Sequence, residues 1–203
     1  MKISVKKMAL AMALTAMPMM GFAGNKGPEW LSKAVAYQIY PSSYQDSDGD
    51  GIGDIPGITS RLDYIKGLGV NVIWLNPVFV SGWFDGGYDI IDFYKVDPRF
   101  GTNTDLVKLI DEAHKRGIRV LLDGVFNHTG RKSVYFNADS FYPAPGAAQG
   151  AQSPYYRWYS FHPFPDDYDA WWGIRNLPAV NEAEESYVDY IIEGEHSIIR
   201  RWL

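Results

Sequence analysis

The sequence has 203 residues, no cysteine and a formal net charge of -5, and 46% of its residues are hydrophobic. This composition supplies enough apolar surface for a buried core and argues against an intrinsically disordered chain. Because disulfides are excluded, packing or a bound metal must stabilise the fold. The 19 Lys and Arg residues form no basic block against the 24 acidic ones, so we expect no nucleic-acid partner.

The N-terminus has the pattern of a secretory signal peptide. Three lysines at positions 2, 6 and 7 precede the apolar run 8–20, and small residues around Ala23 offer a cleavage site. The run is shorter than the roughly 20 residues of a membrane-spanning helix. We expect residues 1–23 to be removed, the mature protein to be secreted or periplasmic, and no stable membrane span after cleavage. An uncleaved anchor is the alternative.

Short apolar runs at 35–40, 70–75 and 118–122 have the length and composition of buried strands. Helical spacing of apolar residues separates them, over 58–68 and again over 106–113. Strands that alternate with helices predict an α/β fold with a parallel sheet and right-handed crossovers. Periodicity alone does not distinguish a closed barrel from an open sheet.

The second of these helical patterns has recognisable end signals. Thr104 is a suitable N-cap for the helix, and Gly117 is a suitable residue to end it. Residues 24–128 therefore hold three strands and two helices.

The alternation of strand and helix patterns stops over residues 129–180, which are rich in aromatic residues and proline and show no convincing hydrophobic period. We interpret this segment as an inserted subdomain. Its tryptophans, Trp158, Trp171 and Trp172, either stack on sugars or form the core of the insert. Helical spacing returns over 181–203, interrupted by Gly194, and predicts a third helix.

An acidic loop follows the first predicted strand. Its spacing matches positions one, three, five, seven and nine of an EF-hand loop through Asp46, Asp48, Asp50, the carbonyl of Ile52, and Asp54. Position twelve is Gly57 instead of Glu, and a strand precedes the loop where an EF-hand has a helix. We therefore favour a single calcium-binding loop, with a solvated acidic turn as the alternative.

Two more motifs follow the second and third predicted strands. Asp85-Gly86-Gly87-Tyr88 pairs a carboxylate with an aromatic ring, and Asp123-Gly124-Val125-Phe126-Asn127-His128 places three polar side chains just after a buried strand. Barrel enzymes keep their chemistry at such strand ends. A glycine-rich loop such as 85–88 is by itself more often structural. A lone histidine is too, but Asp123 and Asn127 at these offsets from His128 favour a site.

These motifs, in this order, resemble the alpha-amylase family, glycoside hydrolase family 13, over about Ala34 to Leu203. The acidic loop and the stretch around Trp171-Trp172-Gly173 are similar to its neopullulanase and oligo-1,6-glucosidase-like branch. The resemblance implies the N-terminal part of a (β/α)8 TIM barrel, with the inserted domain B at 129–180 after the third strand and the third barrel helix at 181–203. The chain would then end before strand four.

The resemblance also implies roles for individual residues. Asp46, Asp48, Asp50, the Ile52 carbonyl and Asp54 would bind Ca2+. Asp85 and Tyr88 would line the subsite of the reacting sugar, His128 would donate a hydrogen bond to it, and Asp123 would support the catalytic arrangement. Asn127 would either orient its loop or bind calcium at a second site.

In that family, hydrolysis proceeds with retention through a nucleophilic Asp after strand four and an acid Glu after strand five. The sequence contains neither position, so we expect an inactive N-terminal fragment of an exported enzyme that hydrolyses alpha-glucans: starch, maltodextrin, pullulan or cyclodextrin. A noncatalytic protein that binds calcium and carbohydrate is one alternative. A parent enzyme that is a transglycosylase or isomerase is another. The oligomeric state is not predicted.

Overall fold

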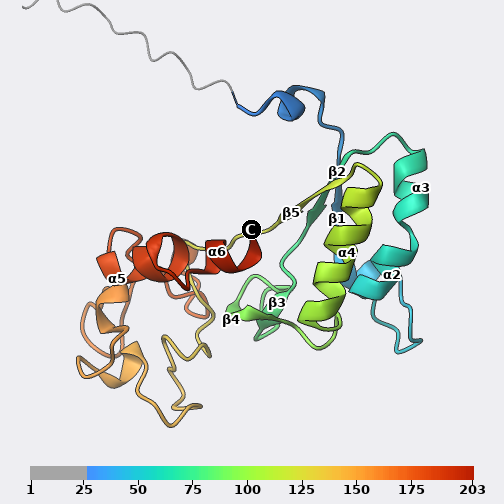
Figure 1. Cartoon of the computed structure of the whole chain (residues 1–203). Helices are drawn as coiled ribbons and strands as arrows, with labels where there is room; N and C mark the ends of the chain where they lie inside the picture. The colour runs from blue at the N-terminus through green and yellow to red at the C-terminus, as the bar shows by residue number, and fades with distance from the viewer. Residues whose placement is uncertain (1–26) are drawn as a thin grey trace, which may run out of the picture. The chain divides into compact units, whose positions relative to one another are not determined.

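A computed structural model describes residues 27–203 of the chain, so the predicted signal peptide at 1–23 lies outside the described residues. The described chain divides into two units after Ala34. The short unit holds a 3-10 helix, Glu29–Lys33, that buries no residue. The main unit, Val35–Leu203, holds the sheet, the helices around it and the irregular segment that follows (Figure 1).

A parallel sheet of three strands forms the centre of the main unit, in the order β1-β2-β5. The strands are β1 (Ala36–Ile39), β2 (Val72–Leu75) and β5 (Arg119–Leu122). Ala36 pairs with Val72, which pairs with Arg119, and the register continues without a shift to the last residues. The predicted parallel sheet is confirmed. Because the strands are parallel, their carboxyl ends meet at one edge.

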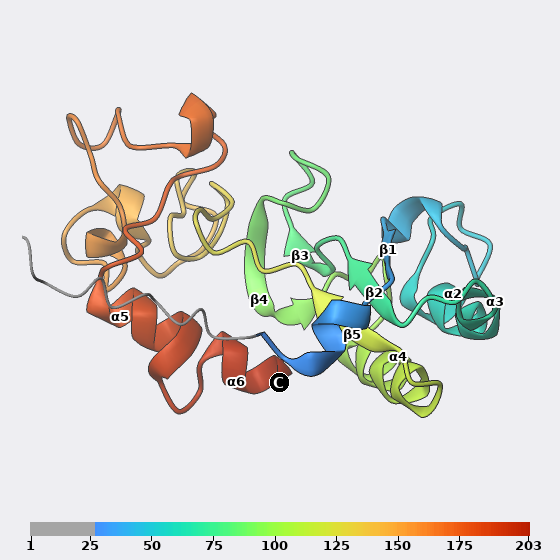
Figure 2. The ribbon, with the colours of Figure 1, turned by 90° about the horizontal axis from the view of Figure 1, so that it is seen from above.

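Helices α2 (Ile55–Ser60), α3 (Leu62–Gly67) and α4 (Asn103–Lys115) lie on one side of this sheet (Figures 1 and 2). The single helix predicted over 58–68 is therefore two helices, which meet at Arg61, whose φ of -101° and ψ of 4° interrupt the helical geometry. The apolar stripes of all three helices are fully buried against the sheet, through Ile55, Ile58, Leu62, Ile65, Leu106, Leu109 and Ala113.

The N-cap of α4 is Thr102, so the prediction of Thr104 is wrong by two residues. The Thr102 hydroxyl accepts from the backbone N–H of Asp105, and the Asp105 carboxylate accepts from the N–H of Thr102. This reciprocal capping box requires an acidic residue three positions after the cap, and Thr104 has no such partner at position 107. Gly117 follows the helix with a φ of +69°, as the predicted end signal requires.

An antiparallel hairpin that is absent from the predicted elements lies between β2 and α4. It consists of β3 (Phe79–Ser81) and β4 (Ile90–Val96), paired with two register shifts. The main unit thus has five strands among its described residues, three of which form the predicted parallel sheet.

Residues 129–180 contain only isolated bridges and short 3-10 turns: Ala147–Gln149, Tyr156–Trp158 and Trp171–Gly173. Their core is largely aromatic, with Tyr135, Phe136, Trp158, Tyr159 and Tyr168 buried beside a few aliphatic residues such as Leu177. A bridge between His128 and Ala179 pairs the start of this insert with its end. Of the three tryptophans of the insert, Trp158 belongs to this core, whereas Trp171 and Trp172 are exposed.

The predicted third helix is broken into α5 (Glu185–Val188), a π-helical turn (Asp189–Glu193) and α6 (Ile198–Trp202). Gly194 ends the first part, as its interruption of the pattern indicates, and the Ser197 hydroxyl caps α6. Across the described residues, no helix is long and apolar enough to cross a membrane.

Candidate active site and acidic loop

A chain of hydrogen bonds links polar side chains at the carboxyl ends of the three parallel strands. Gln38 donates to Asn76 at 3.0 Å, and Asn76 donates to the Tyr88 hydroxyl at 3.3 Å. Tyr88 and the Trp74 indole both donate to Oδ2 of Asp123, at 3.1 and 3.3 Å. The network brings Tyr88 and Asp123, two of the predicted site residues, into direct contact.

Burial raises the pKa of Tyr88 to about 12, and the nearby Asp123 carboxylate adds to this effect. The phenol therefore stays protonated across the physiological pH range and donates to Asp123. Asp123 accepts hydrogen bonds from two donors and is half-buried, and its supporting role stays a prediction.

The loop that carries Asp85 and Tyr88 is held by Asp89. Its carboxylate is buried and accepts from the Ser81 hydroxyl at 2.9 Å and from the backbone N–H groups of Phe84 and Asp85. Short polar side chains commonly fix loops in this way. The Asp85 side chain itself is exposed, which leaves its carboxylate accessible to a ligand.

His128 is only 3% exposed, and its Nε2 lies 3.2 Å from the backbone carbonyl of Tyr88. A carbonyl only accepts, so Nε2 carries the proton of this hydrogen bond. Nδ1 is buried and has no hydrogen-bond partner among the described residues. Burial lowers the pKa of His128, so the ring is neutral at pH 7 and Nδ1 is an open acceptor.

Asn127 lies half-buried between Phe126 and His128. Its backbone carbonyl accepts from the N–H of Val180 at 3.0 Å, which ties this loop to the end of the insert. The role of its side chain, in orienting the loop or binding a second calcium ion, stays a prediction.

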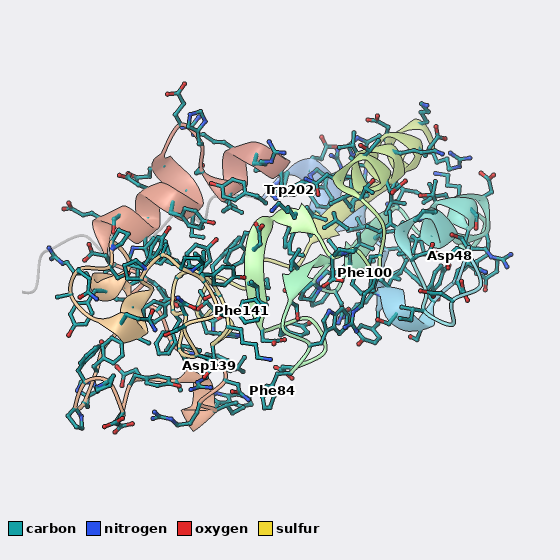
Figure 3. All side chains as sticks on the ribbon, turned by 90° about the horizontal axis from the view of Figure 1, so that it is seen from below. Asp48, Phe84, Phe100, Asp139, Phe141 and Trp202 are labelled. Carbon is teal, nitrogen blue, oxygen red and sulfur yellow. The ribbon has the colours of Figure 1, made fainter. Side chains whose placement is uncertain are left out.

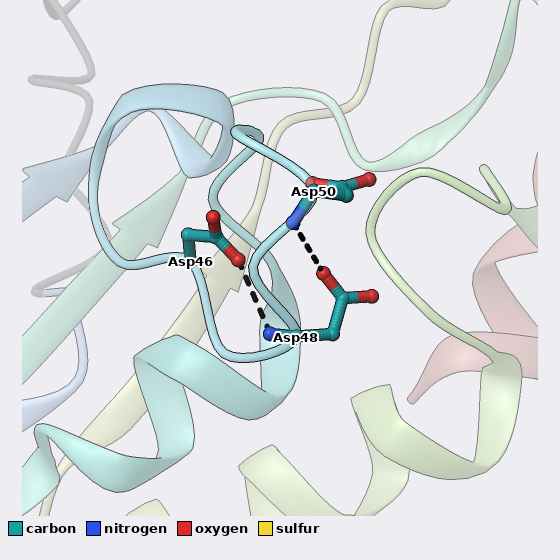
Figure 4. A group of neighbouring side chains, drawn as sticks. All are labelled: Asp46, Asp48 and Asp50. Carbon is teal, nitrogen blue, oxygen red and sulfur yellow. Dashed lines mark hydrogen bonds between the residues drawn. The ribbon is translucent and has the colours of Figure 1, made fainter.

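The acidic loop brings three of its four carboxylates together. Asp46, Asp48 and Asp50 each offer an oxygen, and these oxygens lie within 4.8 Å of one another (Figure 4). The carboxylates are oriented by backbone N–H groups, such as Gly49 to Asp46 at 2.7 Å and Ile52 to Asp50 at 2.7 Å. Such an oxygen cluster suits a hard divalent cation.

Hydrogen bonds from the backbone N–H groups of Gly49 and Gly51 lower the pKa of Asp46. Both glycines have positive φ, 86° and 91°, which the tight path of the loop requires. The loop lies beside α2, where Figure 3 labels Asp48.

Asp54 is not part of this cluster. It is the N-cap of α2, where its Oδ1 accepts from Gly57 at 2.6 Å and its Oδ2 accepts from the N–H and hydroxyl of Ser47. Three protein donors thus occupy most of the acceptor capacity of a carboxylate. The assignments of Asp54 and of the Ile52 carbonyl as metal ligands stay predictions.

The sequence reading missed the contributions of Gln38, Trp74 and Asn76. Gln38 and Trp74 lie in strands and Asn76 follows β2, so the parallel register alone brings them to the same edge as Asp123. Their position at or just after the end of a predicted strand could have identified them. The apolar residues of each strand drew attention away from these side chains.

With this geometry in place, comparison with known proteins decides the family. Residues 38–185 match the family described as "Alpha amylase, catalytic domain". The chain belongs to the alpha-amylase family. This match covers β2, β5 and the end of β1, the acidic loop, the network at the strand ends and the whole insert.

Relatives and solved structures agree with this membership. An amylopullulanase of Thermoanaerobacterium thermosulfurigenes is 36% identical over 87% of this chain and 12% of its own length. An oligo-1,6-glucosidase of Heyndrickxia coagulans is 54% identical over 53% of this chain and 20% of its own length. The trehalulose synthase MutB from Pseudomonas mesoacidophila superposes with a TM-score of 0.73 at 31% identity, covering 87% of this chain and 34% of that chain.

The chain therefore spans between about an eighth and a third of the length of these proteins. The superposition confirms the predicted fold class, since the neighbours are barrel enzymes of the alpha-amylase family and this chain matches part of their length.

Proposed function

We propose that this chain is the N-terminal part of a glycoside hydrolase that acts on alpha-glucans. The observation that carries the proposal is the polar network at the strand ends, in which Tyr88 contacts both Asp123 and His128. Family membership and relatives named amylopullulanase and oligo-1,6-glucosidase support this substrate class.

The network defines what this chain would contribute to the reaction. Tyr88 presents a ring that is held in place by its hydroxyl, and the exposed Asp85 carboxylate accepts sugar hydroxyls. Neutral His128 has an unpartnered nitrogen, Nδ1, which is buried and would accept from a sugar hydroxyl once the ring turns to expose it. Its other nitrogen donates to the sugar if the ring turns away from the Tyr88 carbonyl. These groups bind and orient the reacting unit, and Asp123 fixes Tyr88.

We propose that the nucleophile and the acid/base lie in a part of the protein outside this sequence, and that they act with retention. Support comes from an uncovered sheet face. Gln38, Trp74 and Leu121 are register neighbours on the side away from the helices, and all three are exposed. Parallel sheets are normally covered on both faces.

The free edge of β5 also supports the proposal that the catalytic residues lie outside this sequence. Among the described strands, β5 pairs only with β2. A groove of about 360 Å³ runs along β5 and α6 and is lined by Leu121, Leu122, Ile198 and Trp202. A fourth parallel strand would fit this apolar edge.

The test is to express the natural reading frame that contains this sequence and to assay maltodextrin, pullulan and cyclodextrin. We expect hydrolysis that releases the alpha-anomer first, as followed by NMR, and no hydrolysis by the 203-residue chain alone. Initial release of the beta-anomer would contradict retention. Robust turnover by the 203-residue chain would overturn the placement of the catalytic residues.

A second candidate is a transglycosylase or isomerase of the same family. The structural likeness to a trehalulose synthase favours it over unrelated activities. Product analysis separates the two, because an isomerase converts a disaccharide to another disaccharide with little free glucose. A protein without catalysis would instead bind maltooligosaccharide in calorimetry and turn over none of these substrates.

We further propose that the acidic loop binds Ca2+ through Asp46, Asp48 and Asp50, joined by Ile52 and Asp54. The clustered oxygens support the proposal. Calcium at 100 times its dissociation constant should stabilise the protein by about 2.7 kcal/mol, seen as a raised melting temperature. Asp48→Ala should abolish this calcium response, whereas Asp166→Ala, in the insert, should retain it. Equal responses in both variants would contradict the site.

Export is proposed on the sequence alone, from the lysines and apolar run of residues 1–23. Mass spectrometry of the protein released from the cell should give a mature N-terminus at Gly24. Recovery of an intact Met1 in the membrane fraction would indicate an uncleaved anchor instead.

A further inference from the structure

Three stacked rings run from the candidate site to the surface of the insert. The His128 and Trp171 ring centroids are 5.9 Å apart with planes at 25°, and those of Trp171 and Trp172 are 5.4 Å apart at 11°. Exposure rises along the stack, from 3% for His128 through 39% for Trp171 to 84% for Trp172. The outermost indole is thus connected to the buried histidine by one intervening ring.

Packing does not explain the presence of Trp172. Trp158 of the same insert is buried and donates from its indole to Ser186, as a core tryptophan does. Trp172 instead places nearly all of its surface in solvent and has a φ of +49°, a region that bulky side chains avoid. Both features oppose folding stability, and such residues concentrate at ligand-binding sites.

The turn that carries Trp172 is firmly fixed. Backbone hydrogen bonds from Gly173 to Ala170, from Ile174 to Trp171 and from Trp171 to Leu177 close it, at 2.9 to 3.0 Å. The bridge between Ala170 and Pro178 continues directly into the bridge between Ala179 and His128. The exposed indole is therefore preorganised on the same backbone ladder that holds the histidine.

The chemistry of the surface favours a neutral ligand with an apolar face. The nearby Arg175 is occupied, because it pairs with Asp167 at 2.7 Å and lies over the Tyr168 ring. The net charge of -5 also disfavours polyanions. A sugar ring has an apolar face that suits a flat exposed indole and hydroxyl groups that remain in water.

We propose that Trp172 is a stacking platform for a glucosyl unit of the alpha-glucan, remote from the unit that reacts beside His128. This inference rests on the proposed function, because it takes its ligand from the site that the stack adjoins. It makes Trp172 a determinant of preference for longer chains, while the groups around Tyr88 bind the reacting unit.

The test uses the full-length protein and isothermal titration calorimetry with maltohexaose. Trp172→Ala should weaken binding about tenfold, and Trp172→Phe should restore most of it. The matched control is Phe141→Ala, another exposed aromatic of the insert at 72%, which should bind maltohexaose like the unaltered protein. In kinetics, the KM of Trp172→Ala should rise more for maltohexaose than for p-nitrophenyl glucoside.

The outcomes separate this inference from the proposed function. If the protein hydrolyses alpha-glucans but Trp172→Ala binds maltohexaose unchanged, the platform is wrong and the function stands. If no glucan is hydrolysed yet binding depends on Trp172, the function is wrong and the platform stands. If Trp172→Ala changes only self-association in ultracentrifugation, the indole is a contact between copies and the inference is overturned.

Discussion

The sheet with its helices and the insert at 129–180 bury apolar surface and satisfy their backbone hydrogen bonds in different ways. In the first, aliphatic residues such as Ile58, Ile73 and Leu109 form the core, and regular hydrogen bonding satisfies the backbone. In the insert, the core is aromatic, and Phe136 alone contacts the rings of Tyr159, Phe161 and Tyr168. Large aromatic rings thus bury apolar surface in the insert, as regular helices and strands do around the sheet.

The backbone of the insert depends on side chains for its hydrogen bonds. Asn137 is buried and donates to the carbonyls of Tyr142 and Ala144, while its Oδ1 accepts from the N–H of Tyr142. Gln149 donates to the carbonyl of Asn137 and accepts from Gly146. An irregular segment can be buried only if such partners are present, so single polar residues matter more here than in the sheet.

The largest effect should come from Phe136→Ala, which should lower the free energy of unfolding by about 3–5 kcal/mol. Because the insert has little regular structure, the near-UV circular dichroism should change much more than the far-UV signal. Phe141→Ala, an exposed aromatic in the same segment, should change stability by less than about 0.5 kcal/mol. A cost for Phe136→Ala that matched this control would mean that the insert is not packed as described.

A smaller loss should follow Asn137→Ala, about 2–3 kcal/mol in denaturant unfolding, because buried backbone groups lose their partners. Asn137 also has a φ of +52°, which alanine tolerates poorly. Asn137→Gly removes the side chain without this strain and isolates the hydrogen bonds. If the glycine variant were as stable as the unaltered protein, backbone strain and not hydrogen bonding would explain the alanine result.

In the part built on the sheet, the comparable polar residues are helix caps with smaller effects. Asp54→Ala should cost about 1–2 kcal/mol in chemical unfolding without calcium, since it removes the cap of α2 and the bonds to Ser47. Thr102→Ala, at the cap of α4, should cost about 1 kcal/mol. A larger loss at Thr102 than at Asp54 would reverse this ranking.

The smallest effect should be a pH dependence at His128, where the two regions meet. Burial lowers its pKa in the folded protein. At pH values just below 6.5, the ordinary pKa of histidine, the unfolded chain therefore binds more protons than the folded one. Stability should therefore decline as the pH falls from about 6.5 toward the lowered pKa of the folded state. His128→Gln should show a shallower slope between pH 7 and 5 in thermal unfolding. An equal slope would assign the effect to other groups.

The sheet with its helices and the insert also differ in how much could be predicted from the sequence. The strands at 36–39, 72–75 and 119–122 and the buried stripe of α4 follow from apolar periodicity, because one face of each repeats against the core. The hairpin β3–β4 was missed because its register shifts and its loop with Trp83 at φ +58° disrupt the alternation. In the insert no period exists, so aromatic composition predicted a core without its arrangement.

For the candidate site, position after a strand indicated Asp123 and His128, and the family resemblance indicated Tyr88; the structure links all three through Tyr88. The acidic spacing was sufficient to predict that Asp46, Asp48 and Asp50 cluster, whereas the capping role of Asp54 depends on the exact start of α2. Contacts of Gln38 and Trp74 could not be predicted because they depend on the register between strands that are distant in sequence.

The bridge between His128 and Ala179 means that the insert leaves and rejoins the sheet region at one point. Such a segment is a closed loop, and lengthening a closed loop costs little additional free energy. Changes in its length or composition therefore do not have to move β5 or the network beneath it. The proposed stacking platform at Trp172 lies on this segment, so the binding of remote glucosyl units that we propose can vary without a change in the sheet or its strand-end residues.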